Sequence, residues 1–119
     1  MENKTKNNPT EALEEVVDEK HQKYYYLRLY IAGRTKHSVR ALENLRQICE
    51  EYLEGRYKLE VIDIYQHPEM VLPENIVAIP TLIKKLPPPL QRLVGDMSNT
   101  EKVLVGLDVM PPKSRNADN

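Results

Sequence analysis

The side chains of this 119-residue chain that could carry chemistry are few and scattered. The single cysteine is Cys49, and the three histidines are His21, His37 and His67. None of them stands at the spacing of a metal-binding motif, so we predict no metal site and no cofactor. Because Cys49 falls within an amphipathic helical pattern, we expect its thiol to be a small buried core group without redox chemistry.

Three carboxylates, Asp63, Asp96 and Asp108, could be imagined as catalytic acids or bases. No nucleophile or partner base accompanies them, and turn or strand-end roles are the favoured interpretation. The chain also has no glycine-rich phosphate loop. We therefore predict a protein that is not an enzyme, and we expect any ATP chemistry to belong to a partner.

Composition is that of an ordinary globular domain. Charged residues make up 29% and the formal net charge is -1, which is neither a nucleic-acid footprint nor a disordered acidic composition. No apolar run approaches the roughly 20 residues of a membrane span, and the N-terminus has no signal-peptide pattern. We expect a cytoplasmic protein that binds neither nucleic acid nor membrane.

The first predicted element is a strand that starts at residue 24. Leu27, Leu29 and Ile31 share one face of this strand, with Arg28 and Tyr30 on the other. A helix follows over residues 38–54 and closes at a glycine. Its apolar positions recur at helical spacing and comprise Val39, Leu42, Leu45, Ile48, Cys49 and Tyr52.

A second strand follows over residues 57–64, with apolar residues on both faces from Val61 onward. This pattern predicts a central parallel strand, and the helix before it has the right length for a βαβ crossover. Prolines limit residues 64–77 to a short helical piece. Two further strands are predicted over residues 79–86 and 90–96, before a last helix whose capping box pairs Ser98 with Glu101.

The predicted order is βαβαββα, which matches a thioredoxin-like α/β sheet. Residues 24–110 form this domain, between a flexible N-terminal tail over 1–23 and a disordered tail over 111–119. In this architecture the bond before Pro80 is the candidate cis proline. The architecture favours a cis bond here, whereas the base rate favours trans, because only about one X–Pro bond in twenty is cis. Both isomers therefore stay open.

Several motifs in sequence order resemble those of the KaiB clock-protein family, from about residue 25 to residue 110. They are LRLYIAGRTKHSVRALENL, YKLEVIDIYQHPE, AIPTLIKKLPPPLQRLVGD and EKVLVGLDVM. The resemblance implies a thioredoxin-like protein that has lost redox chemistry. The sequence agrees, because GRTKHS stands where a thioredoxin would place its Cys-x-x-Cys pair. It also implies an alternative ground-state order, βαββααβ, with fold switching between the two.

The resemblance further implies binding to the N-terminal ATPase ring of a KaiC-like protein, with KaiA or a sensor histidine kinase as further partners. A homo-oligomer, either tetramer or dimer, is expected, in circadian timing or in a stress response. Gly106 and Asp108 match the segment in which the family's balance between states is sensitive. The partner-binding residues that it implies are Arg28, Arg40, Lys58, Lys84 and Arg92.

Departures from the family pattern favour a divergent member as much as a clock component. Glu60 replaces a common basic residue, Gln91 interrupts a paired-arginine site, and the acidic N-terminus is unexpected. Two other functions stay open. One is a thioredoxin-like oxidoreductase or glutathione-using transferase without the cysteine pair, and the other is the detached sensor domain of a histidine kinase.

Overall fold

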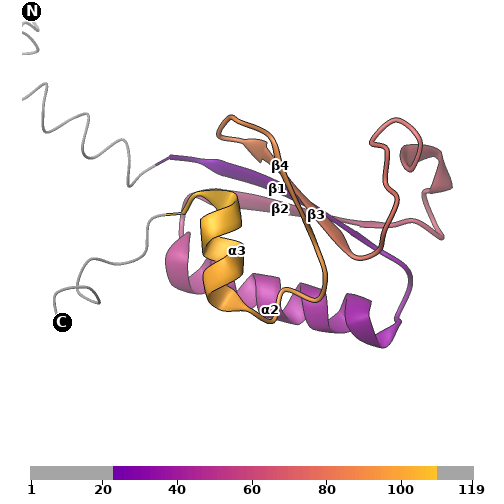
Figure 1. Cartoon of the computed structure of the whole chain (residues 1–119), viewed down its shortest axis with the longest axis horizontal. Coiled ribbons are helices and arrows are strands. Elements are labelled where there is room, and N and C mark those ends of the chain that lie inside the picture. The colour runs from indigo at the N-terminus through magenta and orange to yellow at the C-terminus, as the bar shows by residue number, and fades with distance from the viewer. Residues whose placement is uncertain (1–22, 110–119) are drawn as a thin grey trace, which may run out of the picture.

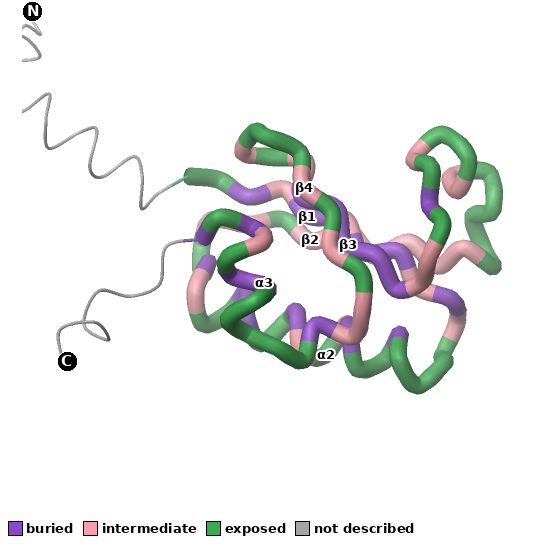
Figure 2. The backbone as a smooth tube through the Cα atoms, viewed as in Figure 1, coloured by how far each residue is buried: buried purple, intermediate pink, exposed green. Residues whose placement is uncertain are grey.

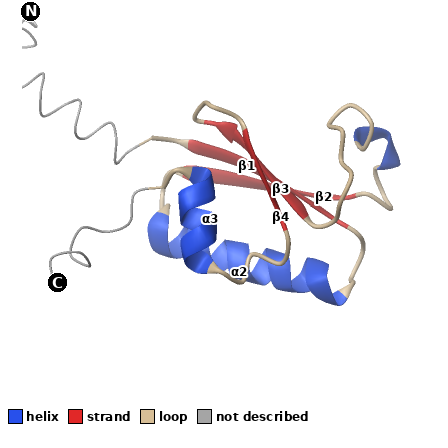
Figure 3. Ribbon diagram, in the orientation of Figure 1, coloured by secondary structure: helices blue, strands red, loops and turns tan. Residues whose placement is uncertain are grey.

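The computed structural model describes residues 23–109, and the expectations for the two tails lie outside these described residues. One sheet and two helices make up most of this part of the chain (Figures 1 and 3). The elements are strand β1 (Tyr25–Ile31), helix α2 (Lys36–Tyr52), strand β2 (Tyr57–Asp63), the 3₁₀ helix η2 (Pro68–Met70), strand β3 (Thr81–Leu86), strand β4 (Gln91–Val94) and helix α3 (Thr100–Leu107).

The sheet has the strand order β2-β1-β3-β4. Strand β1 pairs in parallel with β2, with Leu27 opposite Leu59, and antiparallel with β3, with Leu29 opposite Leu82. The prediction of a central, fully buried β2 is wrong, because β2 forms one edge and its residues are only half-buried or exposed. The central position belongs to β1, whose Leu27 and Leu29 are fully buried.

Both helices cover the same face of the sheet, and the main core lies between them and the strands (Figures 1 and 2). Helix α2 contributes Ala41, Leu45 and Ile48, while α3 contributes Leu104 and Leu107, among others. The helical spacing predicts Val39 on the buried stripe of α2, which is wrong because this side chain is 39% exposed. Ser38 and Ala41 are buried instead, since small residues let the helix approach the sheet closely.

Among the described residues no α-helix covers the opposite face of the sheet, which we call the open face. The segment between β2 and β3, residues 64–80, crosses only one end of this face (Figure 1). It buries Ile76 against Tyr30 and Ile83 in a second, smaller core. The helical piece predicted here is a single 3₁₀ turn that starts at Pro68, as two prolines within six residues require.

Helix α3 begins one residue later than the predicted capping box. Its N-cap is Asn99, whose side-chain oxygen accepts a hydrogen bond from the Lys102 amide at 3.0 Å. The amide of Ser98 instead donates to the Asp96 carboxylate at 3.0 Å, so Ser98 belongs to the preceding turn. Helix α3 ends at Asp108, which adopts the left-handed conformation with φ 59°.

The observed order of elements is that of the thioredoxin-like alternative, with a helix as the last element, and differs from βαββααβ. The Ile79–Pro80 bond, for which the sequence leaves both isomers open, is cis, as are the bonds before Pro87 and Pro89. No helix within the described residues is long and apolar enough to cross a membrane.

Candidate functional site

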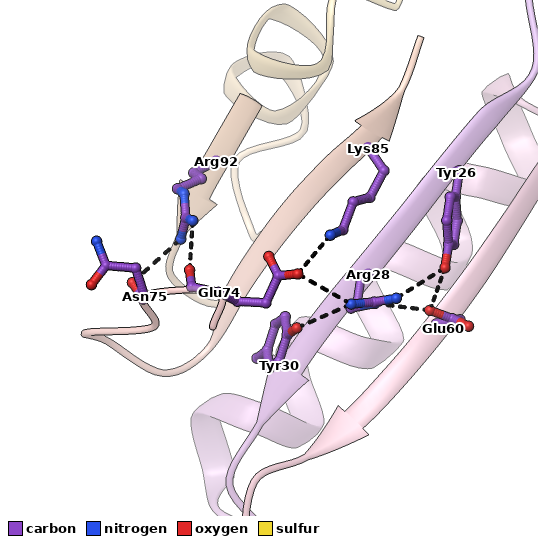
Figure 4. Close-up of polar contacts among 8 residues, drawn as sticks. All are labelled: Tyr26, Arg28, Tyr30, Glu60, Glu74, Asn75, Lys85 and Arg92. Carbon is purple, nitrogen blue, oxygen red and sulfur yellow. Dashed lines mark hydrogen bonds and ion pairs between the residues drawn. The ribbon is translucent and has the colours of Figure 1, made fainter. Parts of the chain in front are cut away.

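The open face carries a polar network centred on Arg28, which projects from the middle of β1 (Figure 4). Its Nε donates to Glu60 Oε1 at 2.8 Å, and its two terminal nitrogens donate to the hydroxyls of Tyr26 and Tyr30 at 3.0 and 3.3 Å. The Tyr26 hydroxyl donates in turn to Glu60 at 2.7 Å. Register explains the cluster, because Arg28 and Glu60 are direct partners across β1 and β2.

These contacts stabilise the charged forms of both groups. Burial lowers the pKa of the Arg28 guanidinium, but the hydrogen bonds to Tyr30, Tyr26 and Glu60 outweigh it and raise the pKa above its usual value. The hydrogen bond from Tyr26 is the main cause of the lowered pKa of the Glu60 carboxyl, with Arg28 adding to it. Arg28 and Glu60 are therefore held as an ion pair at neutral pH.

A second carboxylate, Glu74, joins the segment between β2 and β3 to the open face. Its Oε2 accepts from Lys85 Nζ at 2.7 Å and from Arg28 at 3.4 Å. The Arg92 guanidinium donates to the backbone oxygens of Glu74 and Asn75 at 2.6 and 3.5 Å (Figure 4). Cations from three strands thus hold this segment in place.

Two cations of the open face keep a largely exposed charge. The Lys58 side chain is 57% exposed and lies 3.9 Å from Glu60 and 5.3 Å from the centre of the Tyr26 ring. Arg92 is exposed, and both of its hydrogen-bond acceptors are uncharged carbonyl oxygens. Three of the five predicted partner-binding residues, Arg28, Lys58 and Arg92, therefore share one face of the sheet.

The other two predicted partner-binding residues lie elsewhere. Arg40 is exposed on α2, which covers the opposite face of the sheet. Lys84 also points to that covered face, because it pairs with Leu27 in β1, and its side chain is fully buried. An exposed contact role for Lys84 is therefore wrong for this conformation.

Among the described residues, Lys84 has a buried side-chain nitrogen, Nζ, without a hydrogen-bond partner. Burial lowers the pKa of its ammonium group, and the Asp108 carboxylate opposes this effect without forming an ion pair. A buried ammonium without a partner costs free energy, so this residue destabilises the observed packing.

The predicted switch residues lie at the last turn of α3. A Cβ atom on Gly106 would come within 2.5 Å of a terminal methyl of Leu93 in β4. Glycine therefore lets α3 pack closely on β4. Asp108 ends the helix, and its backbone oxygen accepts a hydrogen bond from the Tyr25 hydroxyl at 2.9 Å.

The three aspartates considered as catalysts have structural contacts. Asp63 accepts from the amides of Gly33 and Tyr65 at 3.0 Å each, and Asp96 accepts from the Ser98 amide. Between residues 23 and 109 no three His, Cys, Asp or Glu side chains gather as a metal site would require. Cys49 is buried inside α2, and burial raises the pKa of its thiol to about 12.

Sequence reasoning missed Glu74, Lys85 and Tyr26, which complete the open-face network. Tyr26 could have been found from alternation alone, since it lies two residues before Arg28 on the same strand face. Lys85 could not, because a register irregularity between Tyr26 and Leu27 changes how β3 is paired at that point. Glu74 lies in an irregular segment, where no periodicity indicates direction.

Comparison with known proteins gives a consistent result. The family model described as the KaiB domain matches residues 28–109. Circadian clock protein KaiB3 of Synechocystis sp. is 54% identical over 85 residues, which are 71% of this chain and 83% of that protein. Circadian clock oscillator protein KaiB of Microcystis aeruginosa is 47% identical over 98 residues, covering 82% and 94% of the two chains.

Solved structures resemble the fold at lower identity. The N-terminal domain of Synechococcus elongatus SasA has a TM-score of 0.59 and 21% identity, covering 72% of this chain and 85% of that one. Mitochondrial thioredoxin 3 of Saccharomyces cerevisiae has a TM-score of 0.59 and 15% identity, covering 81% and 88%. These structures show the fold, and the family match over residues 28–109 together with the relatives at 54% and 47% identity shows that the chain belongs to the KaiB family.

Proposed function

We propose that this chain is a non-enzymatic regulator that binds the N-terminal ATPase ring of a KaiC-like protein, in circadian timing or in a stress response. The observation that carries the proposal is the family match, which runs from Arg28 in β1 to the end of α3. The relatives are circadian clock proteins, which supports a regulatory role in a clock.

The surface of the described fold supports recognition of an acidic partner. Lys58 and Arg92 present exposed charges on one face, and their neighbour Arg28 is held rigidly by four hydrogen bonds. Exposed cations on a rigid sheet raise association rates with an acidic surface and fix its orientation. Arg40 adds a cation on α2, away from this face.

Binding is tested by size-exclusion chromatography with light scattering, using the chain alone and mixed with a KaiC-like ATPase and ATP. We expect a dimer or tetramer that slowly yields a complex. Changing Lys58 and Arg92 together to Ala should weaken the complex by at least tenfold. Changing Lys36 and Arg46 together to Ala, at two exposed positions of α2, removes the same charge; this matched control should have little effect. A monomer that never binds would contradict the proposal.

We further propose that the chain exchanges between the observed arrangement and βαββααβ, with Gly106 and Asp108 setting the balance. Two features support this: the buried, unpartnered Lys84 penalises the observed packing, and the last helix contains a glycine. A small free-energy difference between two packings is what a switch requires. KaiA or a sensor histidine kinase would then be further partners.

The likeness to the SasA domain favours a second candidate, a sensor-type thioredoxin-like module. Such a module would stay monomeric in one arrangement, whereas a switching regulator would show two sets of amide signals by NMR. The oxidoreductase alternative finds no support at the start of α2, where Arg34, Thr35 and Lys36 stand without a thiol. An insulin-reduction assay tests it, and we expect no turnover.

A further inference from the structure

An acidic stretch precedes the described fold. Residues 11–19 contain five carboxylates and no basic residue, and residues 1–22 as a whole carry six carboxylates against three lysines, a net charge of −3. Runs of like charge of this kind are typical of interaction tails.

The open face of the sheet has the opposite charge. This surface carries two carboxylates and four cations, one cation from each strand, so its net charge is +2. The cations are Arg28, Lys58, Lys85 and Arg92. The carboxylates, Glu60 and Glu74, are already bound within the network. The unsatisfied part of the charge therefore lies on the two exposed cations, Lys58 at one edge and Arg92 at the other.

The acidic stretch is joined to the fold beside this face. The Lys23 carbonyl accepts from Arg56 at 3.5 Å, and β1 begins two residues later. Lys58 lies opposite Tyr26 at this same end of the sheet. The four residue steps from Glu19 to Lys23 span up to about 14 Å when extended, and Tyr26 is only about 10 Å along the chain from Lys23. The stretch can thus reach Lys58 by folding back once.

We propose that residues 11–19 fold back over the open face and bind Lys58 and Arg92, occupying the surface intended for an acidic partner. The regulatory part of this proposal rests on the proposed function, because the same cations would meet the ATPase. A short tether gives the stretch a high effective concentration, so even weak ion pairs compete with a partner. Screening makes the contact sensitive to salt.

A spin label at position 12 tests the contact in the full-length chain without any partner. Cys49 is buried and its thiol has a pKa of about 12, so the variant Ala12→Cys takes a nitroxide label at one site. We expect strong relaxation enhancement at the amides of Lys58 and Arg92 at low salt. The amides of Arg40 and Arg46 on α2 should be unaffected, because α2 covers the other face. Equal enhancement on both faces, or none, overturns the contact.

Charge removal provides the matched comparison. Replacing Glu14 and Glu15 by Gln and Asp18 by Asn should reduce the enhancement at the open face by at least threefold. The control replaces by Gln three exposed carboxylates on or just after α2, namely Glu43, Glu51 and Glu54. It changes the net charge by the same amount and should leave the relaxation enhancement at the open face unchanged. Raising the salt concentration to about 0.5 M should act like the first variant.

The regulatory half is measured separately by titration with the KaiC-like ATPase and ATP. The variant lacking three tail carboxylates should bind at least threefold more tightly than the wild type, and the α2 control should not. If the label shows the contact but both bind equally, autoinhibition is overturned while the contact stands. If neither binds the ATPase, the proposed function fails, and the relaxation result still decides the contact.

Discussion

Among single residues, Cys49 shows how the fold removes reactivity from a group that could have it. Its thiol lies in the core between α2 and the sheet, and burial raises its pKa to about 12. At pH 8 only about one thiol in ten thousand is then ionised, and the thiolate is the reactive form. We expect no alkylation by iodoacetamide at pH 8 within an hour, and complete alkylation in 6 M guanidinium chloride. Rapid reaction of the native chain would contradict the buried position.

Lys84 is the residue whose replacement we expect to stabilise the observed packing. Its ammonium group is fully buried without a hydrogen-bond partner, whereas a methionine of similar length would fit the same apolar surroundings. The Lys84→Met variant should raise Tm by about 4–8 °C, which corresponds to roughly 1 kcal/mol for a domain of this size. Lys85→Met is the control, and it should lower Tm because Glu74 loses a partner.

The pH dependence of stability should carry the signature of the same lysine. Burial lowers its pKa in the fold below the ordinary value of 10.5, so the folded state binds this proton less tightly than the unfolded state does. As pH rises through the lowered pKa toward 10.5, the folded state loses its proton first and the penalty disappears. The difference in stability between Lys84→Met and wild type should therefore shrink as pH rises toward 10.5, as denaturant titrations would measure. A constant difference would contradict this assignment.

At the scale of the element, the start of α3 depends on Asn99. Its side-chain oxygen accepts from the Lys102 amide, while Ser98 contributes only to the turn around Asp96. Asn99→Ala should cost about 1 kcal/mol, and Ser98→Ala only a few tenths. Thermal unfolding followed by circular dichroism distinguishes the two. The reverse order of effects would restore the capping box that the sequence predicts.

The segment between β2 and β3 is held by Glu74, and its mobility should depend on that carboxylate. In Glu74→Gln the ion pairs with Lys85 and Arg28 are lost, while the buried Ile76 keeps its place in the second core. Hydrogen exchange at the amides of Asn75 and Ile76 should speed up by about tenfold or more. Glu69→Gln, whose carboxylate is exposed beside His67, is the control and should change little.

Sequence patterns predicted the type and order of the elements better than their surroundings. Alternation placed Leu27 and Leu29 on the covered face, because period two is a property of any strand. The position of β2 at an edge could not be deduced, since the apolar Ile62 packs under the segment between β2 and β3 and not under a helix. Likewise Lys84 and Lys85 are neighbours in sequence, and only strand register determines which of them is buried.

For the molecule as a whole, we expect a substitution at Gly106 to change the balance between the observed arrangement and βαββααβ. Alanine is favoured over glycine in a helix by about 1 kcal/mol, but its Cβ would come within 2.5–3.1 Å of both methyls and the Cγ atom of Leu93, so α3 could not pack as closely on β4. Because overpacking of this kind typically costs about 1–3 kcal/mol, Gly106→Ala should reduce the population of the observed arrangement. Size-exclusion chromatography and NMR amide signals measure it, and an unchanged population would contradict the role of this glycine.

The hydrogen bond from the Tyr25 hydroxyl to the Asp108 backbone oxygen joins positions 83 residues apart. The first strand and the end of the last helix are therefore in contact, so the two ends of the described fold lie close together. A linker of a few residues between Lys23 and Val109 could complete a ring. The chain could then be cut within residues 71–75 to give a circular permutant, in which α3 precedes β1 and carries the same contacts in a different order of synthesis.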